Sequence, residues 1–565
     1  MKSLLYKLVC FWLLLTSSIK VPLANAQEIL PLNEVKPGMQ GLCKTVFEGT
    51  RIEDFGIEVL EIIKNFYPQK DVILVRLTGP IVEKTGVVSG MSGSPVYIDG
   101  KLVGALAYRV GSFQKEPIAG VTPIEQMMEI VSKEKVRQQE MSLKLGGSLF
   151  PVELALGLHK NGLEEFFLQS LRLKKLVTTS LSPIQTPLVF SGFQGKVIQR
   201  FAGFFEELGF IPLQGGYSAE EPSQTTEPGL VPGAPVSGVL IDGDMSLSGT
   251  GTITYRDKNQ ILAFGHSFFD SGPVKLPMAE AKILTTMSSL MSSYKISQIT
   301  QVVGSIHQDR TTGILGIIGE PPVMIPVTVR YHSPFQETQT FRFRVAEEKS
   351  LNSYTPLFLW LALLNAVESA RLAEGEYSLN LKGTIQLKDH KAIILDNFFA
   401  GSTSATDDVT QATGEVAAVI ASLLMNNFKI PKIENIELDF HCQPGKKLAE
   451  IEGVWYDKSE VKPGESLNLV IFIRPFQGKI QKIAQKVKIP SQLSSGWLTL
   501  WVGSAEYMMN LEKSLTPMKF QPQDFSQLIQ LLNTKKKNHI LFLQLRKPDK
   551  GAIIQGQELP SLPPS

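Results

Sequence analysis

The spacing of apolar residues in the first part of the chain predicts a mainly β unit over residues 27–136. Asp71–Leu77 has the near-continuous apolar character of a mostly buried strand. Val96–Ile98 and Leu102–Tyr108 flank the turn Asp99-Gly100 and predict a β-hairpin. A helix is expected over Ile124–Val136, after which the apolar pattern weakens.

A second β unit is predicted over residues 236–320. Its clearest element is Gly249–His266, in which one strand, a polar turn at Arg256–Gln260 and a second apolar strand follow one another. Residues 137–235 connect the two units. They include a linker at 215–233 rich in Gly, Pro, Ser, Thr and Glu, which predicts a flexible loop.

Beyond residue 320 the pattern predicts two further domains. Apolar helices are expected over Leu357–Ala373 and Gln411–Asn427, among strands, which indicates an α+β domain at 321–430. The first helix is too short in its apolar part to span a membrane. Alternating strands follow from residue 431, and they favour an immunoglobulin-like, β-sandwich-like domain and tail over 431–565.

The N-terminus has the pattern of a secretory signal peptide over residues 1–26. Met1–Lys7 is short and basic, Leu8–Ser17 is apolar, and Ala24-Asn25-Ala26 offers small residues for cleavage before Gln27. We therefore expect a mature protein that is exported to the periplasm or outside the cell, with no stable membrane span.

Composition narrows the class of protein. A chain of 565 residues predicts three or four units, and a net charge of +2 argues against a nucleic-acid partner.

Of the 3 cysteines, Cys43 and Cys442 lie outside the signal peptide and in different predicted domains, which favours two separate thiols over a disulfide. The adjacent pair His441-Cys442 is a poor chelate, so we expect no metal and no cofactor.

Residues 90–95, Gly-Met-Ser-Gly-Ser-Pro, carry the strongest chemical signal. Acyl transfer needs an exposed hydroxyl on a tight turn and nearby N–H groups for the oxyanion. In a trypsin-like geometry Ser92 would be the nucleophile, and the N–H groups of Gly90 and Ser92 would form the oxyanion hole. The alternative is a surface turn rich in turn formers. A hairpin after the serine favours a β-barrel peptidase over an α/β-hydrolase, where a helix would follow.

A serine nucleophile needs a base, and His266 is the best candidate among 7 histidines. It follows Gly265 at a strand end, where barrel enzymes place catalytic side chains. A structural histidine at the end of a strand is the alternative. His307 is the main competitor, whereas the remaining ones lack such a context: His159, His332, His390, His441 and His539.

Two stretches resemble one family. Glu83–Pro95 resembles the nucleophile region of the SpoIVB-type serine peptidases, and Gly251–His266 resembles their histidine region. The resemblance covers roughly residues 35–130 and 236–320. It implies a trypsin-like double β-barrel core, Ser92 as nucleophile and His266 as general base. Here the serine region precedes the histidine region, the reverse of the order in the sporulation peptidase.

The family's acid is missing from its usual place. Thr78-Gly79-Pro80 stands where the resemblance puts the aspartate, and loss of that acid can lower the rate by about 10⁴. Asp244 is our first substitute, and Asp270 and Asp309 are others.

The sequence therefore predicts an exported serine endopeptidase that makes limited cuts in an envelope or secreted protein, with a protein or peptide as substrate. The alternative is a catalytically inactive protein that keeps the peptidase fold and binds or scaffolds an envelope partner through its C-terminal domains. Gly79 favours the alternative, while the joint presence of Ser92 and His266 favours the enzyme.

Overall fold

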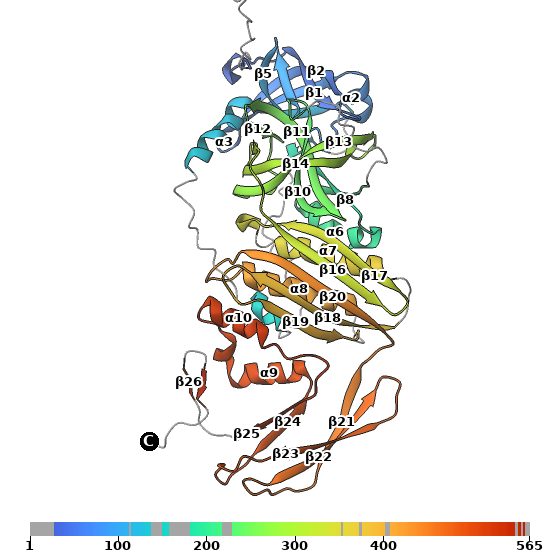
Figure 1. Cartoon of the computed structure of the whole chain (residues 1–565). Coiled ribbons are helices and arrows are strands. Elements are labelled where there is room, and N and C mark those ends of the chain that lie inside the picture. The colour runs from blue at the N-terminus through green and yellow to red at the C-terminus, as the bar shows by residue number, and fades with distance from the viewer. Residues whose placement is uncertain are drawn as a thin grey trace, which may run out of the picture.

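The computed structural model describes residues 27–111, 115–136, 150–156, 181–216, 229–351, 354–371, 376–401, 407–547, 552–554 and 557–559. The predicted signal peptide and most of the linker at 215–233 lie outside these residues. The units follow one another from a β-barrel at one end to a small α+β part at the other (Figure 1). Among the described helices, none is long and apolar enough to cross a membrane.

The first unit is a closed antiparallel barrel. Its six strands, in order around the barrel, are β1 (Gln40–Val46), β2 (Ile52–Tyr67), β3 (Lys70–Thr78), β6 (Ile118–Pro123), β5 (Lys101–Val110) and β4 (Pro95–Ile98). Pairing of β4 with both β5 and β1 closes the ring, so each of its strands is paired on both sides. A short helix, α2 (Pro80–Thr85), precedes β4, and α3 (Ile124–Val136) follows β6 as predicted.

The second unit is also a closed barrel of six antiparallel strands. In order, they are β10 (Pro235–Gly243), β13 (Gly272–Met287), β14 (Tyr294–Arg310), β15 (Gly313–Ile318), β12 (Gln260–Ala263) and β11 (Ser246–Asp257), which pairs again with β10. β8 (Thr186–Ser191) and β9 (Phe210–Gln214) extend the sheet from β11, while β7 (Leu181–Pro183) joins the first barrel. The mainly β, double-barrel fold predicted from the sequence is confirmed.

The second barrel continues into an open sheet. β10 pairs with β17 (Gln336–Ala346), and the order then runs through β16 (Met324–Ser333), β20 (Ile433–Pro444), β18 (Tyr377–Leu387) and β19 (Ile393–Phe399). Helices α7 (Thr355–Ala370) and α8 (Asp408–Leu424) pack on one face of this sheet, and α6 (Gly195–Glu207) packs against α7. Nearly every residue of α7 is buried, so its all-round apolar sequence reflects packing within the protein.

The boundary predicted at 430/431 falls in front of a strand of this same sheet. β20 lies between β16 and β18. Its alternating pattern predicts a strand with one buried face, but it does not show which sheet the strand joins. After residue 444 the described chain forms a three-stranded sheet, two two-stranded ribbons and two α-helices, in place of an immunoglobulin-like sandwich of about seven strands. These elements are β21 (Ala449–Tyr456), β22 (Ser466–Pro475), β23 (Gln481–Lys488), β24 (Thr499–Gly503), β25 (Phe542–Arg546), β26 (Ala552–Ile554), β27 (Gln557–Leu559), α9 (Ala505–Leu515) and α10 (Phe525–Asn533).

Candidate active site

Ser92 lies in a tight loop between α2 and β4. The loop uses glycine on both sides of the serine, because Gly90 (φ +97°) and Gly93 (φ +95°) adopt backbone angles that other residues rarely take. The N–H of Met91 donates to the carbonyl of Val88 over 3.0 Å, and the Ser94 hydroxyl donates to the carbonyl of Met91 over 2.6 Å. These bonds fix the loop.

Two N–H groups of this loop have the properties that an oxyanion hole requires. Gly90 and Ser92 are both buried, yet neither donates its backbone N–H to an acceptor within the described part of the chain. Buried backbone donors are almost always paired. A pair of adjacent free donors on either side of Met91 therefore favours a site that receives an oxygen atom from outside the protein.

His266 follows the end of β12, as predicted. Phe264 (φ +69°) and Gly265 (φ +67°) turn the chain sharply after Ala263. Gly265 faces β5 of the first barrel, where a Cβ atom would lie 3.0 Å from the methyl groups of Ala105 and Ala107. The turn thus brings His266 to the boundary between the barrels.

The imidazole of His266 is held in the protonation state that a general base needs. It is buried, and Nδ1 lies 2.8 Å from the carbonyl oxygen of Ser267, to which it donates. With the proton on Nδ1, Nε2 carries the lone pair. Burial lowers the pKa of His266 to about 4, partly offset by the carbonyls of Ser267 and Ile184. The ring is therefore neutral near pH 7.

The serine loop and the histidine loop meet on β11. Thr252 donates its N–H to the carbonyl of Ser92 over 2.7 Å and its hydroxyl to the carbonyl of Gly90 over 3.1 Å. The carbonyl of Thr252 accepts from the N–H of Phe264, two residues before His266, over 3.2 Å. The two predicted motifs, far apart in sequence, are thus joined through one residue.

The side-chain atoms that the sequence predicts to react make no hydrogen bond in the described part of the chain. Ser92 Oγ and His266 Nε2 are both buried and lack a partner in the described part of the chain, so they do not bond to each other. Neither is occupied by a competing group. Catalytic hydrogen bonds are often long in a free enzyme and shorten when substrate binds.

Asp244 lies at the other end of β11. Its carboxylate accepts the N–H of Arg342 over 2.7 Å, in the turn between β10 and β11. Thr252 is eight residues farther on, which corresponds to roughly 25 Å of extended strand. Asp244 therefore fixes this turn against β17, and the group that orients His266 is the carbonyl of Ser267 instead.

Asp309, the last of the predicted substitutes, holds the histidine loop. It is buried, and its carboxylate accepts the N–H groups of Phe268 and Phe269 over 2.7 Å each and that of Ser271 over 3.1 Å. Burial raises the pKa of Asp309 to about 6, against the opposing effect of these bonds. Asp309 is therefore a positioning residue for the segment that follows His266.

His307, the competing histidine, has other partners. Its Nε2 lies 3.2 Å from the hydroxyl of Ser305 and 3.2 Å from a carboxylate oxygen of Glu320. Its ring is thus part of a polar cluster on β14, whereas Nε2 of His266 is free.

The structure also places a buried lysine against the serine loop, which the sequence analysis missed. Lys295 donates its backbone N–H to the carbonyl of Ser89, and its ammonium group donates to Thr45 Oγ1 over 2.7 Å. Its aliphatic chain covers Gly90, where a Cβ atom would approach Lys295 Cβ and Cδ to 3.3 Å. Burial lowers the pKa of Lys295 to about 7. The available signal was a charged residue at an inward-facing position of β14.

A pocket of about 150 Å³ opens beside the serine loop. It is lined by residues 83–87, which lead into the loop, and by residues 289–293 between β13 and β14. Ser293 joins its two sides, since its carbonyl accepts the N–H of Ser89 and its hydroxyl donates to the carbonyl of Thr85. Neither Ser92, which is fully buried, nor His266 is among the residues that line this pocket.

Both cysteines in the described part of the chain, Cys43 and Cys442, are free and buried. Burial raises the pKa of each thiol, so both are protonated near pH 7.

Comparison with known protein families gives a match to part of the chain. Residues 15–128 match the model of the family described as SpoIVB peptidase S55, whereas no curated protein and no solved structure matches the chain. The matched segment contains the first barrel with Ser92 and ends before His266. The likeness to the SpoIVB peptidases is thus shown for the segment that carries the serine loop, which is less than half of the chain.

Proposed function

We propose that the protein is a serine endopeptidase in which Ser92 is the nucleophile and His266 the general base. The observation that carries this proposal is that buried groups of the serine and histidine loops, which are both bonded to Thr252, are left without a partner. Ser92 Oγ, His266 Nε2 and the N–H groups of Gly90 and Ser92 are all buried and unpaired within the described residues. Such groups are costly to bury unless a ligand pairs with them.

The proposed mechanism follows from the role that each group can fill. Ser92 Oγ attacks the scissile carbonyl while His266 Nε2 takes its proton, and the oxyanion accepts the N–H groups of Gly90 and Ser92. His266 then gives the proton to the leaving amine, and water releases the acyl group by the same steps in reverse. The carbonyl of Ser267 keeps the second proton on Nδ1. In this mechanism the hydrogen bond between Ser92 Oγ and His266 Nε2 forms only when substrate binds.

The site also indicates a slow enzyme. A backbone carbonyl orients His266 but carries no full negative charge, so it stabilises the imidazolium less than a carboxylate does. Limited, regulatory cleavage suits such a site better than digestion. The predicted signal peptide further supports export, with an envelope or secreted protein as substrate.

The second candidate is a catalytically inactive binding protein with the same fold. It is favoured by the glycine at the acid's position. Gly79 (φ +129°) directly precedes α2 and donates its N–H to a carboxylate oxygen of Glu83. On this alternative, the C-terminal units would contact an envelope partner.

Labelling with a fluorophosphonate distinguishes the two functions. We expect the purified mature protein to be labelled slowly, Ser92→Ala and His266→Ala to lose the label, and His539→Ala, which removes an exposed histidine, to keep it. Equal labelling of the Ser92→Ala variant would refute the assignment of the nucleophile. No labelling of the folded wild type, with or without candidate envelope proteins, would favour the binding protein.

A further inference from the structure

The open sheet beyond the second barrel carries a histidine cluster on its polar face. β16 and β20 run parallel, and their register sets His332 directly opposite His441. The two imidazole rings stack with their centres 4.3 Å apart. Asp439 is two residues before His441 and so points to the same face. Tyr331, just before His332, and Phe440, between Asp439 and His441, are buried on the other face of the sheet.

Three potential ligand atoms converge there. One atom each from His332, Asp439 and His441 lies within 4.8 Å of the other two. His332 Nε2 is 2.8 Å from Asp439 Oδ1. Ligand bonds to Zn²⁺ are about 2.0–2.2 Å long, so donor atoms on one ion are roughly 3–4 Å apart. An imidazole binds a metal ion in the plane of its ring, whereas these two rings lie nearly parallel, at 10°. One ring therefore has to turn out of the stack to bring all three atoms onto one ion.

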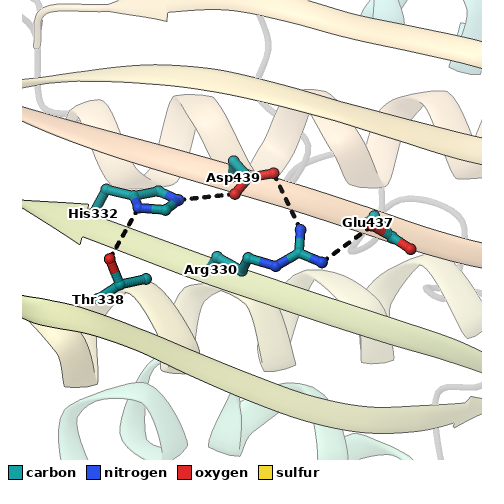
Figure 2. A network of polar contacts seen from close by, with 5 residues as sticks. All are labelled: Arg330, His332, Thr338, Glu437 and Asp439. Atoms are coloured by element: carbon teal, nitrogen blue, oxygen red, sulfur yellow. Dashed lines mark hydrogen bonds and ion pairs between the residues drawn. The ribbon is translucent and has the colours of Figure 1, made fainter.

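Neighbouring groups orient these ligands. His332 Nδ1 lies 3.1 Å from the hydroxyl of Thr338, and Arg330 Nη1 lies 3.3 Å from Asp439 Oδ2 (Figure 2). Arg330 also pairs with Glu437 over 3.2 Å. The outer atoms of the ring and of the carboxylate are thus engaged, and the inner atoms face each other. Metal ligands are commonly fixed in this way by a second layer of hydrogen bonds.

A fourth oxygen is available on β18. Asn380 is the cross-strand neighbour of His441, and directly opposite residues share a face of the sheet. Its Oδ1 is buried and has no hydrogen-bond partner within the described residues. Lys382, two residues farther along β18, pairs in register with Asp439. One row across three strands therefore presents an amide oxygen and two imidazoles, with a carboxylate beside it.

We propose that His332, His441 and Asp439 bind a divalent transition-metal ion of the Zn²⁺ class, with Asn380 or water as fourth ligand. Imidazole nitrogens with one carboxylate suit Zn²⁺ and similar borderline ions rather than Mg²⁺ or Ca²⁺. The ion would join three strands that lie far apart in the sequence. The sequence predicts no metal, because His441 has only Cys442 beside it along the chain, and His332 is more than a hundred residues away.

Isothermal titration of Zn²⁺ into the mature protein, carrying no histidine tag, tests this site. We expect one ion per chain with a dissociation constant in the micromolar range or below. His332→Ala and His441→Ala should each weaken binding at least tenfold, and His539→Ala should not. Binding that is absent from the wild type, or equal in all four proteins, would overturn the proposal.

Replacement by Co²⁺ gives a readout that does not depend on folding changes in the variants. A tetrahedral Co²⁺ site absorbs visible light strongly, and we expect this band in the wild type and its loss on addition of excess Zn²⁺. A six-coordinate spectrum that Zn²⁺ leaves unchanged would contradict the four-ligand site.

Discussion

The carbonyl of Ser92 accepts the N–H of Thr252 over 2.7 Å. This bond joins the serine loop of the first barrel to the strand of the second barrel that leads toward His266. Thr254 repeats the contact, since its hydroxyl donates to the carbonyl of Gly93 over 2.7 Å. The barrels are therefore joined through the backbone of the candidate site, and a change in the fit between them alters the site directly.

Gly93→Ala should disrupt this contact. A Cβ atom at Gly93 would lie 1.9 Å from the carbonyl oxygen of Thr252 and 2.5 Å from the N–H nitrogen of Phe264, both backbone atoms that cannot move aside cheaply. We expect a loss of about 3 kcal/mol or more in the free energy of unfolding and no fluorophosphonate labelling. Chemical denaturation measures the first and gel fluorescence the second.

Gly100→Ala is the matched control. Gly100 also has a positive φ (+76°) but nothing lies within 4 Å of its added Cβ, so only backbone strain of about 1–2 kcal/mol is expected, with labelling kept. Equal effects of both substitutions would mean that strain, and not the barrel contact, explains Gly93.

The rate at which the fluorophosphonate labels Ser92 should follow the titration of His266, which takes place at lower pH than for an ordinary histidine. Because the pKa of His266 is lowered to about 4, the base stays deprotonated far below pH 6.5. We expect the labelling rate to be nearly constant from pH 7 down to pH 5 and to fall below about pH 4. A midpoint near 6.5 would show that the imidazole is solvated when the site reacts.

The same shift predicts a stability change. Between about pH 4 and 6.5 the unfolded histidine binds a proton that the folded one does not, so stability is fully present above pH 6.5 and is lost as the pH falls. The 2.5-unit difference corresponds to about 3 kcal/mol by pH 4. Denaturation of wild type and His266→Gln across this range measures it, and parallel curves would contradict the buried neutral ring.

Ser92 and His266 were predictable as candidate site residues because Ser92 lies in a glycine-rich turn and His266 follows a strand end. Local patterns also predicted the flanking strands and the helix at Ile124–Val136, whereas the double barrel was implied by the resemblance to the SpoIVB-type peptidases. Local patterns carry this information since turn chemistry and alternation are set by neighbouring residues.

What the sequence could not supply were contacts between distant strands. Asp309 bonds to the histidine loop from β14, and Lys295 reaches Thr45 across the barrel boundary. The parallel pairing of β16 with β20 that brings His332 to His441 is likewise invisible in either segment alone. Asp244 was chosen because it is near the histidine hairpin in sequence. In the structure it lies at the end of β11 that is remote from Thr252 and His266, so it is too far away to orient the imidazole.

Asp309→Asn should loosen the histidine loop. The amide oxygen of asparagine can still accept a hydrogen bond from the loop. Its NH₂ group, however, would face backbone N–H groups that now donate to the second carboxylate oxygen, and these would lose their acceptor. Losing such a charged acceptor lowers the free energy of unfolding by about 1.5–3 kcal/mol, and we expect slower labelling of Ser92 with an unchanged labelling midpoint in pH. Asp270→Asn, in the same loop but exposed, is the control. Wild-type labelling in a folded Asp309→Asn protein would exclude the positioning role.

Lys295→Met should stabilise the protein, because methionine keeps the aliphatic packing against Gly90 and removes a buried amine. The pKa of Lys295 is lowered from 10.5 to about 7, so the unfolded chain binds a proton between these values that the folded chain does not. The stability of the wild type therefore rises with pH through this window.

The gain from Lys295→Met should be largest at pH 7 and below. It should shrink by about 2–3 kcal/mol between pH 7 and 9, as measured by denaturant titration at each pH. Lys486→Met, on the exposed strand β23, should show no such trend. If Lys295→Met instead loses stability equally at all pH values, the hydrogen bond to Thr45 outweighs the cost of burying the amine.

Labelling of Ser92 in the Lys295→Met variant separates two roles of this lysine. A retained labelling rate means that Lys295 only supports the loop, whereas a lost rate in a folded protein means that its amine acts on the reaction.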